Sequence, residues 1–399
     1  KRFMRIALIN DDMPFLVDSV AATIAAHGFA IDLLVHPIVP VKRSKAGALA
    51  EIPVAAGTDM ARESMIYVET ARVDARHRRA LESTLKSTLA DVRAAVTDWP
   101  KMRELIAADA AREGDTEGAE LLRWLGDGMI TQLGHITRRR DGSHADMLGV
   151  CRRSARKLLS EASYNRAFAW FGKRHDDGRG EPPLIVKANH ISQVHRRVPL
   201  DLFIVPLREK GRVEALSIHA GIWTSAAMNT LPGAVPRMRA QMAELMDRFG
   251  FTPDGHAGKG LAHALTTLPH DLLIGFSTSD IERVTTAMMA LSDRPRPRLV
   301  LVEAPLKRHL FAFVWLPRDL VSTSARLQIQ QLLEKAADAH VLDWGLEVEG
   351  GNLALLRFVL DIRDGQAPPD DAALDAQLQG MLRGWTEAVE AELARDHEP

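Results

Sequence analysis

The sequence predicts a multi-domain α+β protein with mostly antiparallel sheets. Two observations carry this prediction: residues 5–43 alternate between strand and helix patterns, and residues 271–362 repeat a similar alternation. A third is the stretch between them, because residues 129–229 contain short strand patterns separated by turn residues. A chain of 399 residues is also too long for one compact core, so two or three domains are expected.

The first unit opens with an apolar strand at residues 6–9, which stops at a polar turn. This turn consists of Asn10, Asp11 and Asp12. Pro14 then starts a helix, and Gly28 ends it at a position that favours positive φ. The apolar helix positions, expected in the core, are Phe15, Leu16, Val20 and Ile24. Residues 31–41 are rich in β-branched side chains and return as a second strand.

The rest of the first domain reads as a polar loop at residues 44–62, a strand at 63–73 and a helix at 75–96. The order is therefore βαββα, one strand short of βαββαβ. No strand pattern is evident in the helical segments that follow directly. We therefore expect the fourth strand to be borrowed from residues 129–138.

The middle of the chain reads as a mixed, mostly antiparallel domain. Its clearest strands are residues 184–195, 201–208 and 212–223, preceded by a helix at 154–171. Two helices between residues 232 and 265 lead to the second unit.

The second unit is predicted to open with a strand at residues 271–277 and a capping box, in which Ser279 and Glu282 satisfy free amides at a helix start. The remaining elements are strands at 298–303 and 309–316, a helix at 324–338, strands at 341–348 and 354–362, and a final amphipathic helix at 372–395. The chain starts inside a strand pattern without an initiator Met, so we interpret it as a piece of a longer polypeptide.

Composition narrows the class of protein. Lys and Arg number 51 against 52 Asp and Glu, a balance that gives no reason to expect nucleic acid or an anionic membrane as partner. No apolar run is long enough to span a bilayer. The single cysteine, Cys151, excludes an internal disulfide framework and fits a cytoplasmic location.

The motif search predicts no catalytic, cofactor-binding or metal-binding residues. No G-x-G-x-x-G follows a strand, and the glycine-rich segment 255–260 lacks the spacing of a phosphate loop. No H-E-x-x-H or cysteine pair occurs. His190 and His195 are expected on opposite faces of one strand, which argues against a shared metal.

The best functional candidates lie at the first turn. The candidate effector-binding residues are Asn10, Asp11, Asp12, Met13 and Phe15. The acidic side chains at a helix start are explained by capping, which we favour. Alternatively, the turn holds the amino group of a ligand while helix amides take its carboxylate.

Charged pairs and runs elsewhere are given simpler interpretations. Arg318 and Asp319 are assigned to local capping at another strand-to-helix turn. The basic runs 138–140 and 195–197 are predicted at solvated strand ends, with a subunit contact as the alternative.

Several unusual strings run the length of the chain. They include NDDMPFLVDSV, ESMIYVE, LLRWLGDG, VHRRVPLD, TLPHDLL and FVWLPRDL. On these strings the chain resembles the N-terminal region of the large-type bacterial NAD-specific glutamate dehydrogenases. The resemblance implies ACT-like modules of the ferredoxin-type βαββαβ fold, flanking a PAS-like domain and joined by helical connectors.

The corresponding limits are 1–98 for the first ACT-like domain, 99–128 for a helical connector, 129–230 for the PAS-like domain, 231–270 for a second connector, 271–364 for the second ACT-like domain and 371–397 for a C-terminal helix. The resemblance further implies a parent enzyme that converts glutamate and NAD to 2-oxoglutarate, ammonia and NADH. The NAD site and catalytic domain would lie elsewhere in the same polypeptide. This chain would be a non-catalytic, homo-oligomeric regulatory region with an amino-acid effector, or alternatively a scaffold that only assembles protomers.

Overall fold

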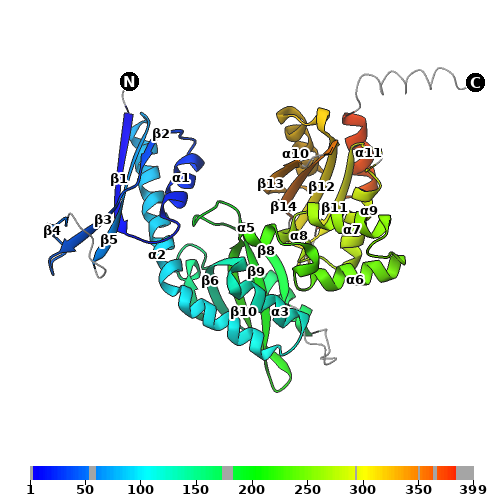
Figure 1. Ribbon diagram of the computed structural model, residues 1–399, viewed down its shortest axis with the longest axis horizontal. Coiled ribbons are helices and arrows are strands. Elements are labelled where there is room, and N and C mark those ends of the chain that lie inside the picture. The colour runs from blue at the N-terminus through cyan, green and yellow to red at the C-terminus, as the bar shows by residue number, and fades with distance from the viewer. Residues whose placement is uncertain are drawn as a thin grey trace, which may run out of the picture.

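The computed structural model describes residues 3–53, 60–172, 183–292, 294–348, 351–362 and 366–382. They form an α+β protein with three antiparallel sheets (Figure 1). We call the three parts the first module, the middle domain and the second module. Figure 1 shows the two modules on either side of the middle domain.

In the sheet of the first module, the last strand in chain order lies at the centre. Its strands are β1 (Phe3–Asp11), β2 (Ile31–Val35), β3 (Ile38–Arg43), β4 (Leu49–Glu51) and β5 (Ala61–Ala71). β5 pairs with β1 on one side and with β2 and β3 on the other. The predicted strand 31–41 is thus broken in two at Pro37, which has no N–H to donate to a ladder.

Two helices cover one face of this sheet: α1 (Leu16–Ala26) and the first half of α2 (Ala75–Arg112). Ile66 and Val68 of β5 pack beneath them with Val20 and Ile24 of α1, as the helical spacing predicted. Three local predictions are corrected. β1 continues through the expected turn to Asp11, α1 begins at Leu16 rather than Pro14, and the short β4 lies within the predicted loop, of which residues 54–59 fall outside the described part.

The borrowed fourth strand is also wrong. Residues 130–139 form β6 (Ile130–Arg139), which pairs with β7 and β10 of the middle domain. Both faces of β6 are buried, so it is a central strand of a covered sheet and has no free edge for the first module. Among the described residues, no strand pairs with the outer edge of β1.

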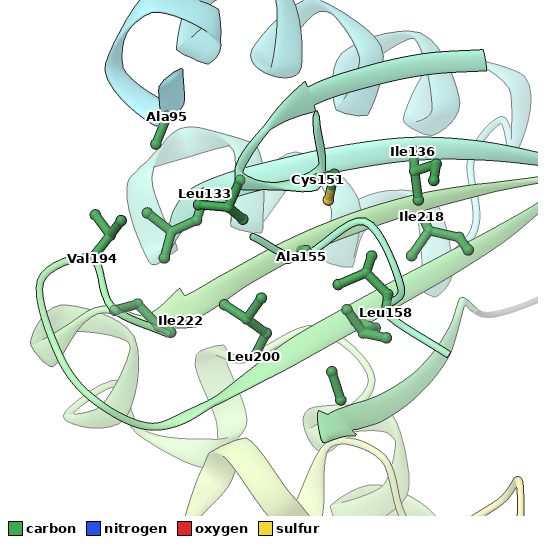
Figure 2. Close-up of a cluster of buried hydrophobic side chains, with 14 of the residues drawn as sticks. Ala95, Leu133, Ile136, Cys151, Ala155, Leu158, Val194, Leu200, Ile218 and Ile222 are labelled. Atoms are coloured by element: carbon green, nitrogen blue, oxygen red, sulfur yellow. The ribbon is translucent and has the colours of Figure 1, made fainter. Parts of the chain in front are cut away.

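The middle domain has five strands in the order β7-β6-β10-β9-β8. Besides β6 these are β7 (His144–Gly149), β8 (Leu184–Ile191), β9 (Pro199–Glu209) and β10 (Arg212–Trp223). One face packs against the 150–160 segment and α4 (Glu161–Gly172), and Figure 2 shows Leu133, Ile136 and Ile218 gathered there with Cys151. The predicted helix 154–171 thus begins later, and β8 ends before His195, which lies in a loop.

The other face of the middle sheet meets the second half of α2 and α3 (Glu117–Trp124). A single 38-residue helix, α2, therefore runs from the first module onto the middle domain (Figure 1). Pro100 lies between its two halves and removes one backbone hydrogen bond there. The two halves of α2 belong to different hydrophobic clusters, because Leu85 of the first half and Ile106 of the second half lie in separate groups of buried side chains.

The second module has the sheet order β11-β12-β14-β13. Its strands are β11 (Arg298–Glu303), β12 (His309–Pro317), β13 (His340–Val348) and β14 (Leu353–Asp361). One face packs against α10 (Thr323–Ala337) and α11 (Asp371–Met381). The remainder of the predicted C-terminal helix, residues 383–397, lies outside the described residues.

The second module is a ferredoxin-like βαββαβ unit with its last strand moved to the front. Counted from β12, the chain gives β12, α10, β13, β14 and α11, and β11 supplies the closing strand. As in that fold, the first strand of the unit lies between the third and the fourth. The strand predicted at residues 271–277 does not exist, because α8 (His270–Leu273) occupies its start. Three consecutive buried apolar residues, Leu272, Leu273 and Ile274, fit a strand or a helix equally well by pattern.

Helices also cover the other face of this second sheet. They are α6 (Met238–Phe249), α7 (His256–Thr267) and α9 (Thr278–Met289), with the short α5 (Ser225–Met228) preceding them. The predicted capping box is displaced, since Ser277 caps α9 by accepting the Asp280 N–H at 3.2 Å. Within the described residues no helix has the length and apolar character needed to cross a membrane.

Candidate functional site

A cleft of about 500 Å³ lies where the first module meets the middle domain. Its polar lining residues are Asn10, Arg93, Thr97, Arg152 and Arg153. Asn10 belongs to the end of β1, Arg93 to α2, and the two adjacent arginines to the segment after β7. The cleft thus brings together side chains from both parts of the chain that α2 connects.

A tight turn positions the two adjacent arginines. Gly149 has φ 58°, and a Cβ atom there would lie 2.1 Å from the carbonyl oxygen of Leu133. Only glycine fits such a close approach. The chain then enters a short 3-10 helix, Val150–Arg152, which brings Arg152 and Arg153 to the cleft.

Arg93 links the cleft to the end of β1. Its guanidinium donates to Asn10 Oδ1 at 2.7 Å and forms an ion pair with Asp11 Oδ2 at 3.0 Å. The Asn10 amide nitrogen donates in turn to the Asp11 carbonyl oxygen at 2.8 Å. The predicted turn residues therefore hold α2 against β1.

The other two guanidinium groups are each near one carboxylate. Arg152 binds Asp98 through two contacts of 2.9 Å, and Asp98 also accepts the Gly149 N–H at 2.7 Å. Arg153 lies 3.6 Å from Asp91, whose burial raises its pKa while Arg153 acts in the opposite direction. A guanidinium has five N–H donors, so each of these two side chains can bind a further anion in addition to its carboxylate partner.

The structure separates the five predicted effector residues. Asn10 lines the cleft and Asp11 pairs with Arg93. Asp12 is bonded to β5 instead: its Oδ1 accepts a hydrogen bond from the Ser64 hydroxyl at 2.7 Å, and its N–H donates to the Arg62 carbonyl oxygen. Met13 packs against the core.

The capping interpretation of the acidic turn is wrong. The N-cap of α1 is Phe15, with φ 72° and no side-chain hydrogen bond to the helix amides. Because β1 extends to Asp11, the carboxylates of Asp11 and Asp12 are directed to Arg93 and Ser64. They join elements distant in sequence.

Phe15 lines a second, apolar cavity of about 270 Å³ together with Pro14, Trp99 and Gln132. Its ring centroid is 5.2 Å from that of His195, which also has positive φ. The His195 N–H donates to Ser19 at 2.9 Å, so this loop of the middle domain contacts the start of α1. The sequence search missed Gln132, a residue that is 5% exposed and whose side-chain amide has no hydrogen-bond partner among the described residues.

The prediction of solvated strand ends for the basic runs is confirmed only in part, because Arg139, Arg140, Arg196 and Arg197 are exposed but several of these arginines are held by specific contacts. Arg138 is buried, binds Glu161 and lies 4.8 Å above the Tyr164 ring. Arg140 lies over Phe168, and Arg196 donates to the Trp223 carbonyl oxygen. The sequence search missed Arg93, Arg152 and Arg153, although the adjacent pair was visible as another short basic run.

Three family models match the chain. Residues 2–85 match "Glutamate dehydrogenase, ACT1 domain", residues 235–294 match "Glutamate dehydrogenase, helical motif 1" and residues 298–386 match "Glutamate dehydrogenase, ACT2 domain". Together they span more than half of the 399 residues. The ACT2 match begins at the first residue of β11, which agrees with the permuted order of the second module.

Curated relatives match nearly the whole chain. The NAD-specific glutamate dehydrogenase of Pseudomonas aeruginosa is 30% identical over 408 residues, which cover 95% of this chain and 25% of the relative. The protein of that name from Halomonas elongata is 28% identical with the same coverage, and the one from Mycobacterium tuberculosis is 25% identical over 94% of this chain and 24% of its own length. The chain thus spans about a quarter of the length of these relatives.

Proposed function

Because the chain belongs to the family of large NAD-specific glutamate dehydrogenases and corresponds to their N-terminal region, we propose that it is the non-catalytic regulatory region of such an enzyme. The parent polypeptide would oxidise glutamate to 2-oxoglutarate and ammonia with NAD as acceptor. Its catalytic domain, which would hold NAD, is the proposed partner of this chain. Two ACT domains, a type associated with regulation, support this role.

The observation that carries the regulatory proposal is the cleft between the first module and the middle domain. A ligand there would contact β1, α2 and the segment after β7 at once. Binding across a junction favours the arrangement of domains that completes the site, which is how a ligand biases a distant equilibrium.

The groups that line the cleft fit an α-amino acid. The guanidinium groups of Arg152 and Arg153 suit its carboxylate, since paired N–H donors match carboxylate geometry. The Asn10 side-chain oxygen suits its ammonium group, with the Asp11 carboxylate following Asn10 in the chain outside the lining. The effector proposal therefore moves from the helix start to the Asn10 end of β1.

Calorimetric titration of the 399-residue chain with each common amino acid tests this proposal. We expect one of them to bind, and Arg153→Gln to weaken its affinity at least tenfold. Arg212→Gln, at an exposed position in the hairpin of the middle domain, is the matched control and should leave the affinity unchanged. Binding of none of them to the folded chain would contradict the effector proposal.

A specific observation also favours the assembly role. The uncovered face of the first sheet carries the exposed side chains Ile9 (60%), Leu33 (46%) and Val35 (46%). The edge of β1 beside them has no strand partner among the described residues. Unpaired edges and apolar patches are typical of interfaces, and we propose homo-oligomerisation through this face.

Light scattering distinguishes the two roles. If the chain only assembles protomers, Leu33→Lys should reduce its mass to that of a monomer, and no amino acid should bind. A monomeric wild-type chain at micromolar concentration would contradict the assembly role. It would leave effector binding to be decided by calorimetry.

For the middle domain we propose a PAS-like fold. Numbered from β6 to β10, its strands lie in the order second, first, fifth, fourth, third, which is the order of PAS domains. The helix α4 between the second and third strands supports this assignment. We also propose the domain limits that were predicted from the sequence for the whole chain.

A further inference from the structure

We propose that Asp109, His135 and His219 bind a divalent transition-metal ion, with zinc as the best fit, inside the middle domain. The site is distinct from the effector cleft and goes beyond the regulatory function proposed above. It would attach the second half of α2 to the sheet beneath it.

The three residues converge from three elements. Asp109 lies near the end of α2, His135 on β6 and His219 on β10, directly opposite His135 in the strand pairing. One ligand atom from each lies within 4.8 Å of the others. All three side chains are about 1% exposed. Two imidazoles and a carboxylate are a common protein contribution to zinc and other first-row metals.

Contacts around the cluster orient these ligands as the outer contacts of metal sites do. His135 Nδ1 lies 3.0 Å from the Asp146 carbonyl oxygen, so Nδ1 carries the proton and the Nε2 lone pair faces the cluster. Arg112 holds Asp109 Oδ1 at 2.6 Å, which leaves Oδ2 directed inward. Asp146 has φ 45°, a conformation uncommon for a residue with a side chain.

The hydrogen-bond pattern at the centre of the cluster is one proton short. The Ser217 hydroxyl lies 2.5 Å from Asp109 Oδ2 and 3.0 Å from His135 Nε2. Both atoms are acceptors when His135 is neutral, yet the hydroxyl has one proton to donate. A metal ion bound at the His135 Nε2 lone pair would give that atom a positive partner, so the hydroxyl could keep its proton on Asp109 Oδ2.

Metal binding requires the cluster to rearrange. His219 Nε2 is 2.6 Å from Asp109 Oδ2, whereas tetrahedral bonds of about 2.0–2.2 Å to a shared ion place two ligands roughly 3.3–3.6 Å apart, so this pair must open by roughly 0.7–1.0 Å. The Ser217 hydroxyl oxygen lies 2.5 Å, 3.0 Å and 3.5 Å from Asp109 Oδ2, His135 Nε2 and His219 Nε2, so it must turn aside or become a ligand itself. His219 must also move its proton to Nδ1, which has no hydrogen-bond partner among the described residues. No proton has to leave the cluster.

Titration of the chelator-treated 399-residue chain with Zn²⁺ and with Co²⁺ tests the site. We expect one ion per chain by calorimetry, and visible absorption of low-coordinate Co²⁺. His135→Ala and His219→Ala should each weaken binding by more than about 100-fold. His340→Ala, at an exposed histidine on β13, is the matched control and should bind as the wild type does.

Asp109→Asn keeps the test decisive if the histidine variants fail to fold. The amide has the same size and can still accept from Ser217, so a native circular dichroism spectrum with lost Co²⁺ absorption supports the site. Wild-type chain that takes up no ion would overturn it. Unchanged binding by Asp109→Asn and both histidine variants would overturn it as well.

Discussion

The two modules differ in how much of their sheets is covered. In the first module α1 and α2 cover one face, and the other carries exposed apolar side chains. In the second module α10 and α11 cover one face while α6, α7 and α9 cover the other. Two ACT domains in one chain therefore have different surroundings. The second contributes a buried structural layer, whereas the first keeps a free surface.

The junctions of the two modules with the middle domain also differ in exposure, here of their charged side chains. On the first side, the His195 imidazole of the middle domain lies 3.0 Å from the Asp18 carboxylate of α1, and both side chains are partly exposed. On the second side, the buried Lys187 lies 2.7 Å from Asp201 and 2.9 Å from Asp271. A ligand can rearrange exposed charges at low cost, whereas a buried charge cluster resists separation. The first junction is therefore the better place for a regulatory movement.

The largest expected difference in the free energy of unfolding is between a variant on the covered face of the second sheet and one on the open face of the first sheet. Phe313 is fully buried between the second sheet and its outer helices, so Phe313→Ala should lower the free energy of unfolding by about 3–5 kcal/mol. Leu33→Ala, on the open face of the first sheet, should change it by less than about 1 kcal/mol. Urea denaturation of both variants measures this contrast. Equal losses would show that the first face is covered in solution.

The next effect compares the two junctions. Lys187→Met leaves two buried carboxylates without their cation and should cost about 3 kcal/mol, the lower end for a broken buried pair. The lower end applies because burial already raises the pKa of Asp201 to about 7, so this group can take up a proton. Asp18→Asn, which weakens the contact of α1 with His195, should cost about 0–1 kcal/mol. Thermal or urea unfolding of the pair decides whether the junctions differ in strength.

A pH dependence should distinguish the second junction. The folded protein keeps the Asp201 proton up to about pH 7, whereas the unfolded chain releases it near its ordinary pKa of 3.8. The contribution of Asp201 to stability is therefore complete at low pH and decreases as pH rises from about 4 to about 7. Asp201→Asn should remove this decrease. Urea midpoints of wild type and variant at pH 5 and pH 7.5 measure it, and identical pH profiles would refute the assignment.

The elements predicted correctly from sequence have a clear local signal. The α1 core positions follow the helical period, and strands β11 and β12 are continuous apolar runs with charged or turn residues at their ends. The strand at residues 271–277 failed because its three consecutive apolar residues fit a helix equally well. The order of strands in the sheets, including the permutation of the second module, depends on pairings between distant segments that local patterns do not encode.

The candidate sites were harder to predict for the same reason. Asn10 was found because it interrupts a strand-to-helix pattern, but Arg93 and Arg152 reach it only through the packing of α2 against both neighbours. Asp109, His135 and His219 have no shared motif. The alternation of Ser217 and His219 in an apolar strand was the only local signal.

The smallest predicted effect on stability concerns the C-terminal ends of two corresponding helices, α1 and α10. Gly28 follows α1 with φ 78°, and Asp338 follows α10, the corresponding helix of the permuted module, with φ 42°. A Cβ atom on Gly28 would touch nothing within 4 Å, so Gly28→Ala should cost about 1 kcal/mol through backbone strain alone.

The reciprocal change, Asp338→Gly, relieves the strain of positive φ but loses an interaction of Asp338, so it should stabilise the chain by less than about 0.5 kcal/mol. Urea denaturation of both variants measures the two shifts. If Asp338→Gly is destabilising instead, the aspartate side chain must contribute more than its backbone strain costs. The two helix ends would then be equivalent in conformation but not in what stabilises them.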